Sequence, residues 1–438
     1  MTNIHKEKFN SIEFGQNCFY IGTLLLASTN FFAGIFYLIA MIASLTNKQI
    51  IFKRDILNFS LLLFTLFLIL STSFIFISHH TREVYELLKE NSWVPSSLWL
   101  SLFNWIPLFL IFYFFQIYVR KENQRIKFAK CLFIGIFPVI FSFFLQKLKI
   151  YGPFEYLNGL VVFYLKPIDD LGGLAGLFNN PNYAGIWLSA SLPFCFLILK
   201  SYKYKKLKFY FIFTIVISII YCMLTTNSRN SFIGLIISTF YMLSAKYLII
   251  GLLILGFLYL SIIQLSTISF FGKLGIQEFF PTTIFQKLLE TNYLSKLQFS
   301  RIDIWAKAIN LISERPIFGW GAATFPILYI MRGGIEKAQH THNMPMEIAQ
   351  NHGIPAAFII VFFVSFLFFK AWKIIFIKNK LSDSYINKAW ITSLLIIIVS
   401  HLSDVTYYDG RISLLIWILL AGLKCILDED KIKISEQI

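Results

Sequence analysis

Two histidines in a polar stretch late in the chain have the residue types that proton transfer needs. His340-Thr341-His342-Asn343 sets two imidazoles two positions apart, ahead of a short segment that ends at Gly353. The unperturbed pKa of imidazole, about 6.5, suits a base that works near neutral pH. Asn343 is expected to open a short helix and Gly353 to close it, so His342 would stand at the helix entrance. A role as general base is therefore chemically open, and a hydrogen-bonding, helix-capping role is the alternative, especially for His340.

A His-x-His pair also occurs in metal sites, which makes metal binding the alternative. A metal site needs further Asp, Glu or Cys ligands at suitable spacing, and none accompanies the pair in the sequence. The five cysteines lie in or beside apolar runs without a Cys-x-x-Cys spacing, and no Walker-type glycine loop is present. The sequence therefore predicts a site without metal or other cofactor, and it disfavours an ATP-driven pump.

Two arginines have settings that suit a bound anion. Arg229 lies in a small polar connection, 225–231, between two apolar blocks. Arg301 follows Ser300 and precedes Asp303, a pattern typical of a helix start, so Arg301 is expected in a first turn where free N–H groups favour anions. A guanidinium fork can hold a phosphate group by two parallel hydrogen bonds. Taken alone, each arginine could equally be a solvated surface residue.

The carboxylates are the remaining candidates. Metal-dependent membrane glycosyltransferases need an acidic motif on the outer face, and the pair at 169–170 lacks supporting spacing while the acidic run at 428–430 lies on the cytoplasmic tail. Both are predicted to be solvated. Asp404 and Asp409 lie near the last outer turn and could pair with one of the arginines, but the sequence does not say which.

The elements that position these residues are predicted to be membrane spans. The chain has 438 residues, of which 57% are hydrophobic and only 14% charged, which excludes a water-soluble protein of this length. Residues 17–46 suit one tilted span or a short helical pair, and the pair is favoured, which gives an all-α polytopic protein with about 11–12 spans. The other spans are predicted at 56–78, 97–118, 128–145, 182–199, 208–225, 231–245, 247–265, 354–370, 388–402 and 411–426.

The formal charge of +16 is best explained by topology rather than by a nucleic acid partner. Lys and Arg gather in alternate loops, which the positive-inside rule assigns to the cytoplasm together with the C-terminal tail. The segments predicted to face outward are 79–96, 146–181, 226–230, 266–353 and 403–410. The chain thus divides into N-terminal transmembrane helices at 1–265, a large outer loop with amphipathic helices and the histidine motif at 266–353, and C-terminal transmembrane helices with a cytoplasmic tail at 354–438.

Together the outer motifs resemble those of the O-antigen ligase and O-antigen polymerase superfamily. In order they are Gly176-Leu177-Phe178-Asn179-Asn180-Pro181-Asn182, Ser228-Arg229, Ser300-Arg301-Ile302-Asp303-Ile304-Trp305, Pro316-Ile317-Phe318-Gly319-Trp320-Gly321, and His342-Asn343 with Gly353 one short helix later. The likeness is strongest over residues 172–370. Gly353-Ile354-Pro355-Ala356 departs from the family pattern, which commonly has a second small residue after Gly-Ile. Proline is tolerated in a first helical turn, so this is interpreted as a variation in helix packing.

The resemblance implies a multi-pass glycosyltransferase of the bacterial inner (cytoplasmic) membrane whose active face is periplasmic. Its substrates would be a glycan carried on undecaprenyl diphosphate and an acceptor glycolipid or glycan. His342 would be the catalytic base, and Arg229 and Arg301 would bind the diphosphate without a metal, supported by Asn343, His340 and Gly353.

The acceptor stays open at this point. A ligase would use a sugar of the lipid A core, a polymerase another lipid-linked glycan, and a protein O-oligosaccharyltransferase a protein. A solute transporter shares the span pattern, but it should carry its ionisable residues in broken spans near the middle of the membrane. Here the candidate residues gather at one outer face, which favours an enzyme. The sugars, their linkage and the oligomeric state are not readable from the sequence.

Overall fold

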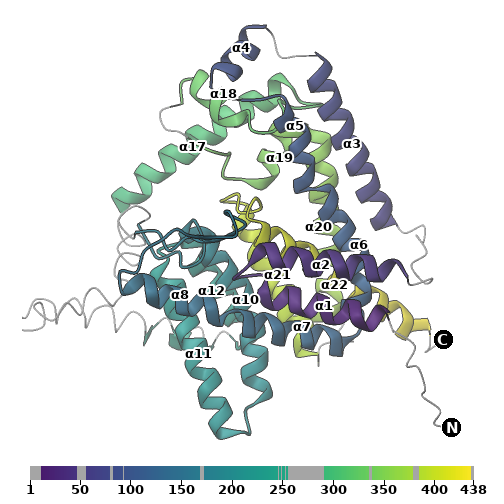
Figure 1. Cartoon of the computed structure of the whole chain (residues 1–438), viewed down its shortest axis with the longest axis vertical. Helices are drawn as coiled ribbons and strands as arrows, with labels where there is room; N and C mark the ends of the chain where they lie inside the picture. The colour runs from purple at the N-terminus through teal and green to yellow at the C-terminus, as the bar shows by residue number, and fades with distance from the viewer. Residues whose placement is uncertain are drawn as a thin grey trace, which may run out of the picture.

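The computed structural model describes residues 11–46, 56–78, 82–91, 93–167, 172–244, several positions between 246 and 254, 291–334, 338–377 and 384–435. Within these ranges the chain is almost entirely helical (Figure 1). The elements are α1 (Ser11–Leu25), α2 (Asn30–Leu45), α3 (Ile56–Ser78), α4 (Arg82–Glu90), α5 (Ser96–Leu100), η1 (Ser101–Asn104), α6 (Ile106–Val119), α7 (Glu122–Gly135), α8 (Phe137–Lys147), β1 (Phe154–Tyr156), β2 (Val161–Phe163), α10 (Pro181–Ser201), α11 (Lys206–Thr225), α12 (Arg229–Met242), α17 (Thr291–Glu314), α18 (Phe325–Met331), α19 (Met344–His352), α20 (Ile354–Trp372), η2 (Lys373–Ile377), α21 (Tyr385–His401) and α22 (Gly410–Ser435).

Seven helical segments in the described ranges are long and apolar enough to cross a membrane. They are Leu57–Ile77, Ser96–Val119, Glu122–Lys147, Pro181–Ser201, Lys206–Thr225, Ile354–Ile377 and Gly410–Ile432, and α2 and α21 are shorter apolar helices. The predicted all-α, polytopic membrane fold is therefore confirmed. The span predicted at 247–265 lies largely outside the described residues, as does the acidic pair at 169–170.

Residues 17–46 form the predicted helical pair. The polar residues Ser28 and Thr29 make the turn, where the Thr29 N–H donates to Leu25 O at 2.8 Å. The hydroxyl of Tyr37 in α2 donates to Thr23 in α1 at 3.2 Å, and the two helices lie side by side in Figure 1. The central polar residues thus reverse the chain direction, which a single tilted span would not allow.

The centre of the bundle is made by α10 and α22, whose apolar windows are 83% and 89% buried. α10 packs against α12 at small residues: a Cβ on Gly234 would lie 2.4 Å from Ser189 Cβ. Small residues let membrane helices approach closely. Trp187, Trp390 and Trp417 fill the surrounding core. This buried scaffold carries the loops at the ends of α10, α12, α21 and α22.

The acidic run predicted to be solvated at the C-terminus lies instead in the last turns of α22. Arg125 is fully buried and donates to Glu429 at 2.8 Å, and the side chain of Asp430 is 5% exposed. The prediction that this run is solvated was wrong, because the ion pair joins α7 to α22. These helices are far apart in the sequence, so no local pattern indicates the pair. This pair ties two distant helices together near the predicted cytoplasmic ends.

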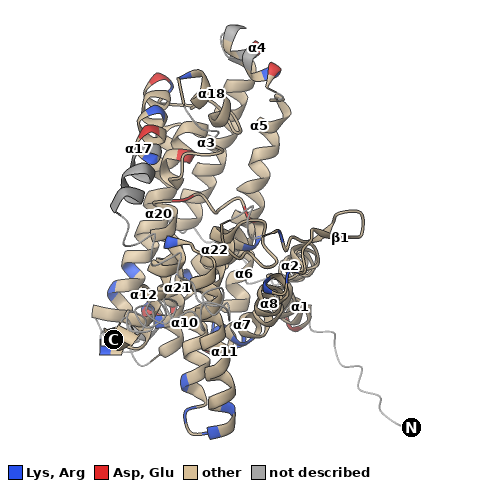
Figure 2. Cartoon of the chain, turned by 90° about the vertical axis from the view of Figure 1, so that its left-hand side faces the viewer, with Lys and Arg blue, Asp and Glu red and all other residues tan. Residues whose placement is uncertain are grey.

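α17 and α18 lie at the other end of the molecule from the α10–α11 turn, a turn that is rich in lysine (Figures 1 and 2). α17 and α18 share a small apolar core that includes Ala308, Trp320 and Phe325. α17 runs from Thr291 to Glu314. The expected helix start at Ser300 is therefore wrong, and Arg301 does not lie in a first turn. Residues 291–299 contain neither Gly nor Pro, so nothing stops the helix before Ser300.

Candidate functional site

Four connecting segments converge at one place beside α17 and α19. They are 172–182, 225–231, 338–343 and 402–409. The Ser403 hydroxyl donates to Asn230 Oδ1 at 2.8 Å, and Asn343 Nδ2 donates to Leu402 O at 3.0 Å. The last outer turn, 402–409, thus contacts both the arginine-bearing loop and the histidine-bearing loop.

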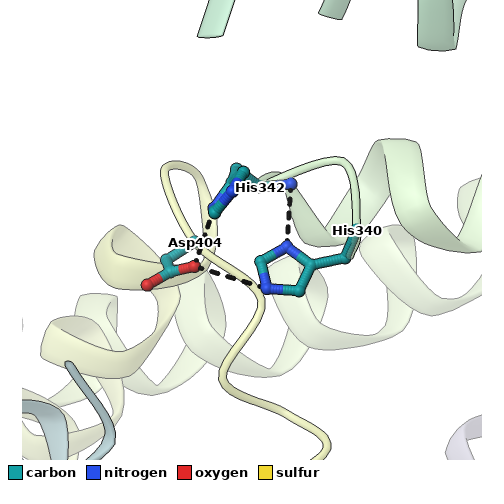
Figure 3. A group of neighbouring side chains, drawn as sticks. All are labelled: His340, His342 and Asp404. Atoms are coloured by element: carbon teal, nitrogen blue, oxygen red, sulfur yellow. Dashed lines mark hydrogen bonds and ion pairs between the residues drawn. The ribbon is translucent and has the colours of Figure 1, made fainter. Parts of the chain in front are cut away.

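His342 and Asp404 form the closest contact between titratable groups in this site (Figure 3). His342 Nδ1 lies 3.1 Å from Asp404 Oδ1, which also accepts the N–H of Val405 at 2.9 Å. Burial raises the pKa of the Asp404 carboxyl, but the hydrogen bond from His342 and the charge of the imidazoles outweigh it and hold that pKa below its usual value. An ionised carboxylate accepts Nδ1–H, which leaves the lone pair of His342 on Nε2. His342 therefore has the tautomer of a base whose Nε2 can take a proton.

His340 supports this arrangement from the other side. Its Nδ1 accepts the backbone N–H of His342 at 3.2 Å, and its Nε2 lies 3.9 Å from Asp404 Oδ1. Burial and the charges of His342 and Arg301 together lower the pKa of His340 to about 4, although the charge of Asp404 opposes this change. His340 is thus neutral at physiological pH, with its proton on Nε2 facing the carboxylate (Figure 3).

The same three side chains could hold a metal ion by distance alone. Ligand atoms of His340, His342 and Asp404 all lie within 4.8 Å of one another. The sequence analysis missed this carboxylate partner, which lies far along the chain from the His-x-His pair. However, a metal ion at this place would need the lone pair of His340 Nε2. The backbone N–H of His342 donates to His340 Nδ1, so the lone pair of this ring is on Nδ1 and its proton is on Nε2. The donor set fits an imidazole hydrogen-bonded to a carboxylate, with a second neutral imidazole beside it, better than a metal-bound triad.

Both predicted arginines lie in this site. Arg229 is the first residue of α12, and Arg301 lies in the middle of α17. Burial lowers the pKa of Arg301, the charge of Asp404 opposes this change, and the charge of Arg229 adds to it. Each guanidinium is half-buried and within electrostatic reach of the other. Two guanidinium groups that influence each other, one of which also influences Asp404 and His340, supply positive charge near the histidine pair, as an anion site requires.

Asn343 and Gly353 bound α19 as predicted. Asn343 Oδ1 accepts the N–H of Met346 at 3.0 Å, which caps the helix directly after His342. Gly353 ends the helix at a φ of +90°, and a Cβ there would lie 1.9 Å from Ile317 O. Only glycine fits this combination of backbone conformation and close approach.

The turn at 316–321 explains why the backbone comes so close to Gly353. Trp320 N–H donates to Gln350 O at 2.8 Å, and Gly321 N–H donates to Asn351 O at 3.0 Å. These donors satisfy carbonyl groups at the end of α19 that the helix itself leaves unpaired. The glycine-containing turn, seen in the sequence only as a motif, therefore fixes the end of the helix opposite His342.

Comparison with known families assigns the segment that carries these residues. The family model described as O-antigen ligase matches residues 213–361. The matched range includes Arg229, Arg301, His342 and Gly353, whereas Asp404 lies beyond it. This match supports the resemblance to the O-antigen ligase superfamily over the part of the chain that carries the two arginines and the histidine motif. No curated protein matches the chain at a significant level.

The apolar helices indicate a multi-pass membrane protein, and the family match over residues 213–361 supports a glycan-transferring enzyme of the ligase or polymerase type. In general terms, this match implies a lipid-linked glycan and an acceptor as partners. Sequence reasoning missed the role of Asp404, although it placed this residue in the last outer turn and expected an arginine partner. The structure pairs Asp404 with His342 instead and places Asp409 beside Arg411, with Asp409 Oδ1 3.9 Å from the Arg411 Nε.

Proposed function

We propose that the protein transfers a glycan from undecaprenyl diphosphate to an acceptor sugar hydroxyl at the periplasmic face of the bacterial inner membrane. The most fitting activity is that of an O-antigen ligase, which attaches polysaccharide to a sugar of the lipid A core. The observation that carries the proposal is the hydrogen bond between His342 and a buried Asp404 beside two half-buried arginines. A base and a cationic surface are the two devices that glycosyl transfer from a diphosphate requires.

In the proposed reaction, Nε2 of His342 accepts the proton of the acceptor hydroxyl as its oxygen attacks the anomeric carbon. The bond from that carbon to the diphosphate oxygen breaks, and its electron pair leaves with the diphosphate. Asp404 stabilises the imidazolium that forms, as the carboxylate does in a Ser-His-Asp triad. Arg229 and Arg301 stabilise the negative charge that develops on the leaving group.

The proposal needs no divalent metal, because two guanidinium groups supply the positive charge. We therefore expect transfer to continue in excess EDTA. A loss of activity in EDTA that Mn²⁺ or Mg²⁺ restores would contradict the metal-free reaction.

Transfer by the purified protein in lipid nanodiscs, with a polyprenyl-diphosphate-linked glycan as donor, tests the assignment of the residues. We expect His342→Ala to abolish transfer and either Arg229→Lys or Arg301→Lys to reduce it on the order of 10²-fold, because a single ammonium group cannot reproduce the guanidinium fork. Arg332→Lys is the matched control, since Arg332 is exposed and pairs with Glu314. Wild-type turnover by His342→Ala would refute the proposed base.

Deletion of the gene followed by analysis of surface glycans separates ligase from polymerase. Loss of polymer on lipid A, with polymer accumulating on its lipid carrier, indicates a ligase. Material with a single repeat unit on lipid A indicates a polymerase, and unchanged glycans would exclude both activities.

A further inference from the structure

A buried carboxylate, Glu347, lies directly behind the histidine segment. It belongs to the first turns of α19, and its side chain is 5% exposed. Its Oε2 accepts the backbone N–H of Thr341 at 2.9 Å, and its Oε1 accepts from Asn351 Nδ2 at 3.2 Å. Its carboxylate does not bond to His342 or Asp404 in the described contacts, so the proposed reaction leaves it without a role.

The bond to Thr341 acts on a backbone that needs support. Thr341 joins His340 to His342, and His342 has a φ of +53°, a left-handed conformation that residues with a side chain rarely adopt. Each polar group of the fully buried Thr341 is used: its N–H by Glu347, its hydroxyl by Asn343 O at 2.9 Å and its carbonyl by Trp305 Nε1 at 3.0 Å. These contacts fix the backbone from which both imidazoles project.

Glu347 also reaches the segment that carries Asp404. The hydroxyl of Tyr408, in the 402–409 turn, lies 3.5 Å from Glu347 Oε1. Asn351 Nδ2 strengthens this link, because it lies 3.2 Å from Glu347 Oε1 and 3.3 Å from the Tyr408 hydroxyl. One carboxylate therefore connects the loop of the proposed base to the loop of its partner.

We propose that Glu347 is a positioning residue for glycosyl transfer, which holds the 338–343 and 402–409 segments in the register that keeps His342 Nδ1 on Asp404. This inference rests on the proposed function. A carboxylate suits the role because it only accepts hydrogen bonds, and donors from three residues converge on it. A glutamine side chain would turn its NH₂ group toward at least one of these donors.

Burial raises the pKa of Glu347 above its usual value, and the hydrogen bonds from Thr341, Asn351 and Tyr408 oppose this rise without cancelling it. The geometry of these donors, rather than the pKa of the carboxyl, carries the proposed role.

The first test is Glu347→Gln in the nanodisc transfer assay, with kcat and KM for the lipid-linked donor measured separately. We expect kcat to fall roughly 10- to 100-fold, the loss that a misplacement of about 1 Å produces. KM for the donor should not change, because the hydrogen bonds described for Glu347 involve Thr341, Asn351 and Tyr408 and not the arginines proposed to bind the diphosphate. Glu314→Gln, the same change at an exposed ion pair on α17, should leave both constants at wild-type values.

A double-mutant cycle with Asp404→Asn separates positioning from general stability. If Glu347 acts by keeping His342 on Asp404, its substitution should cost much less once the carboxylate of residue 404 is gone. The inference would be overturned if the fold-decrease in kcat of the double variant equals the product of the two single decreases. A wild-type kcat for Glu347→Gln would overturn it as well. An active His342→Ala variant would instead overturn the proposed function itself.

Tyr408→Phe tests the link between the two loops if the Glu347→Gln variant does not fold. This change removes the hydroxyl that links the carboxylate to the 402–409 turn and leaves the bond to Thr341 in place. We expect a smaller fall in kcat, roughly 3- to 10-fold, again with an unchanged KM for the donor. An unaltered kcat in folded Tyr408→Phe protein would contradict a link between the two loops.

Discussion

Asp404 gives His342 a defined chemical role. A histidine at a helix entrance can cap, bind a ligand or exchange a proton, and the sequence around His342 is compatible with each of these. The contact at 3.1 Å with a buried carboxylate commits Nδ1 to donate, so that Nε2 is left for the acceptor. The single residue that decides between these roles lies outside the matched family segment.

Replacement of Asp404 by Asn tests this role. The amide can offer its NH₂ group to Nδ1 and so hold the wrong tautomer of His342. We expect kcat to fall on the order of 10²- to 10⁴-fold, with the protein still folded. Transfer kinetics at saturating donor measure the effect. Asp428→Asn, a carboxylate in α22 that pairs with Lys424, serves as the control and should retain activity. Near-normal turnover by Asp404→Asn would exclude the carboxylate from catalysis.

Local patterns predicted the parts of the site that local physics determines. Asn343 and Gly353 were identifiable because helix caps and left-handed glycines leave signals within a few residues. The contact between His342 and Asp404 was not predictable, because α20 and α21 separate the two residues in the sequence. No local pattern near either residue indicates that the chain brings them together. Glu347 shows the same limit, since its tyrosine partner lies in the 402–409 turn.

At the scale of elements, the packing of the 316–321 turn against α19 leaves no room for a Cβ atom at position 353. The Ile354 N–H donates to Pro316 O at 2.7 Å, so this turn and the start of α20 are joined across Gly353. Any side chain at position 353 would separate them. The orientation of α19, and with it that of His342, depends on this contact.

Gly353→Ala should therefore unfold the protein more easily and reduce transfer. The added Cβ meets a backbone oxygen in a conformation that alanine disfavours, and we expect a loss of about 2–4 kcal/mol in stability. Thermal unfolding in detergent measures it. Gly34→Ala in α2 is the control, because a Cβ there meets no atom within 4 Å, and it should be neutral or stabilising by about 0.5–1 kcal/mol. Equal melting temperatures for the two variants would contradict the close packing at Gly353.

The elements themselves were largely predictable because long apolar blocks permit little but membrane helices. The predicted spans at 182–199 and 208–225 became α10 and α11 within a few residues at each end. The start of α17 was wrong because a local capping pattern at Ser300 carries little weight inside a sequence that favours helix on both sides. The burial of Arg125 against α22 depends on tertiary contact alone.

At the scale of the whole molecule, the distribution of charge makes a prediction about orientation. The α10–α11 turn carries five lysines between 200 and 208 and should face the cytoplasm, whereas α17 should face the periplasm. Tyr204 in that turn and Asn310 in α17 are both exposed. Single cysteines at these two positions should react with a membrane-impermeant maleimide from opposite sides.

Intact cells and inverted membrane vesicles provide the two sides for this labelling. Asn310→Cys should be labelled in cells with a permeabilised outer membrane, and Tyr204→Cys only in inverted vesicles. Background labelling should be low, since four of the five native cysteines are buried. Labelling of both positions from the same side would contradict the proposed topology.

The site's dependence on the turn between α21 and α22 also sets an order of events during synthesis. The ribosome makes the two arginines and His342 well before Asp404, and the 402–409 turn takes its place only between the last two helices. A nascent chain therefore holds its base without the carboxylate that orients it until α20 and α21 have entered the membrane and the 402–409 turn has followed them.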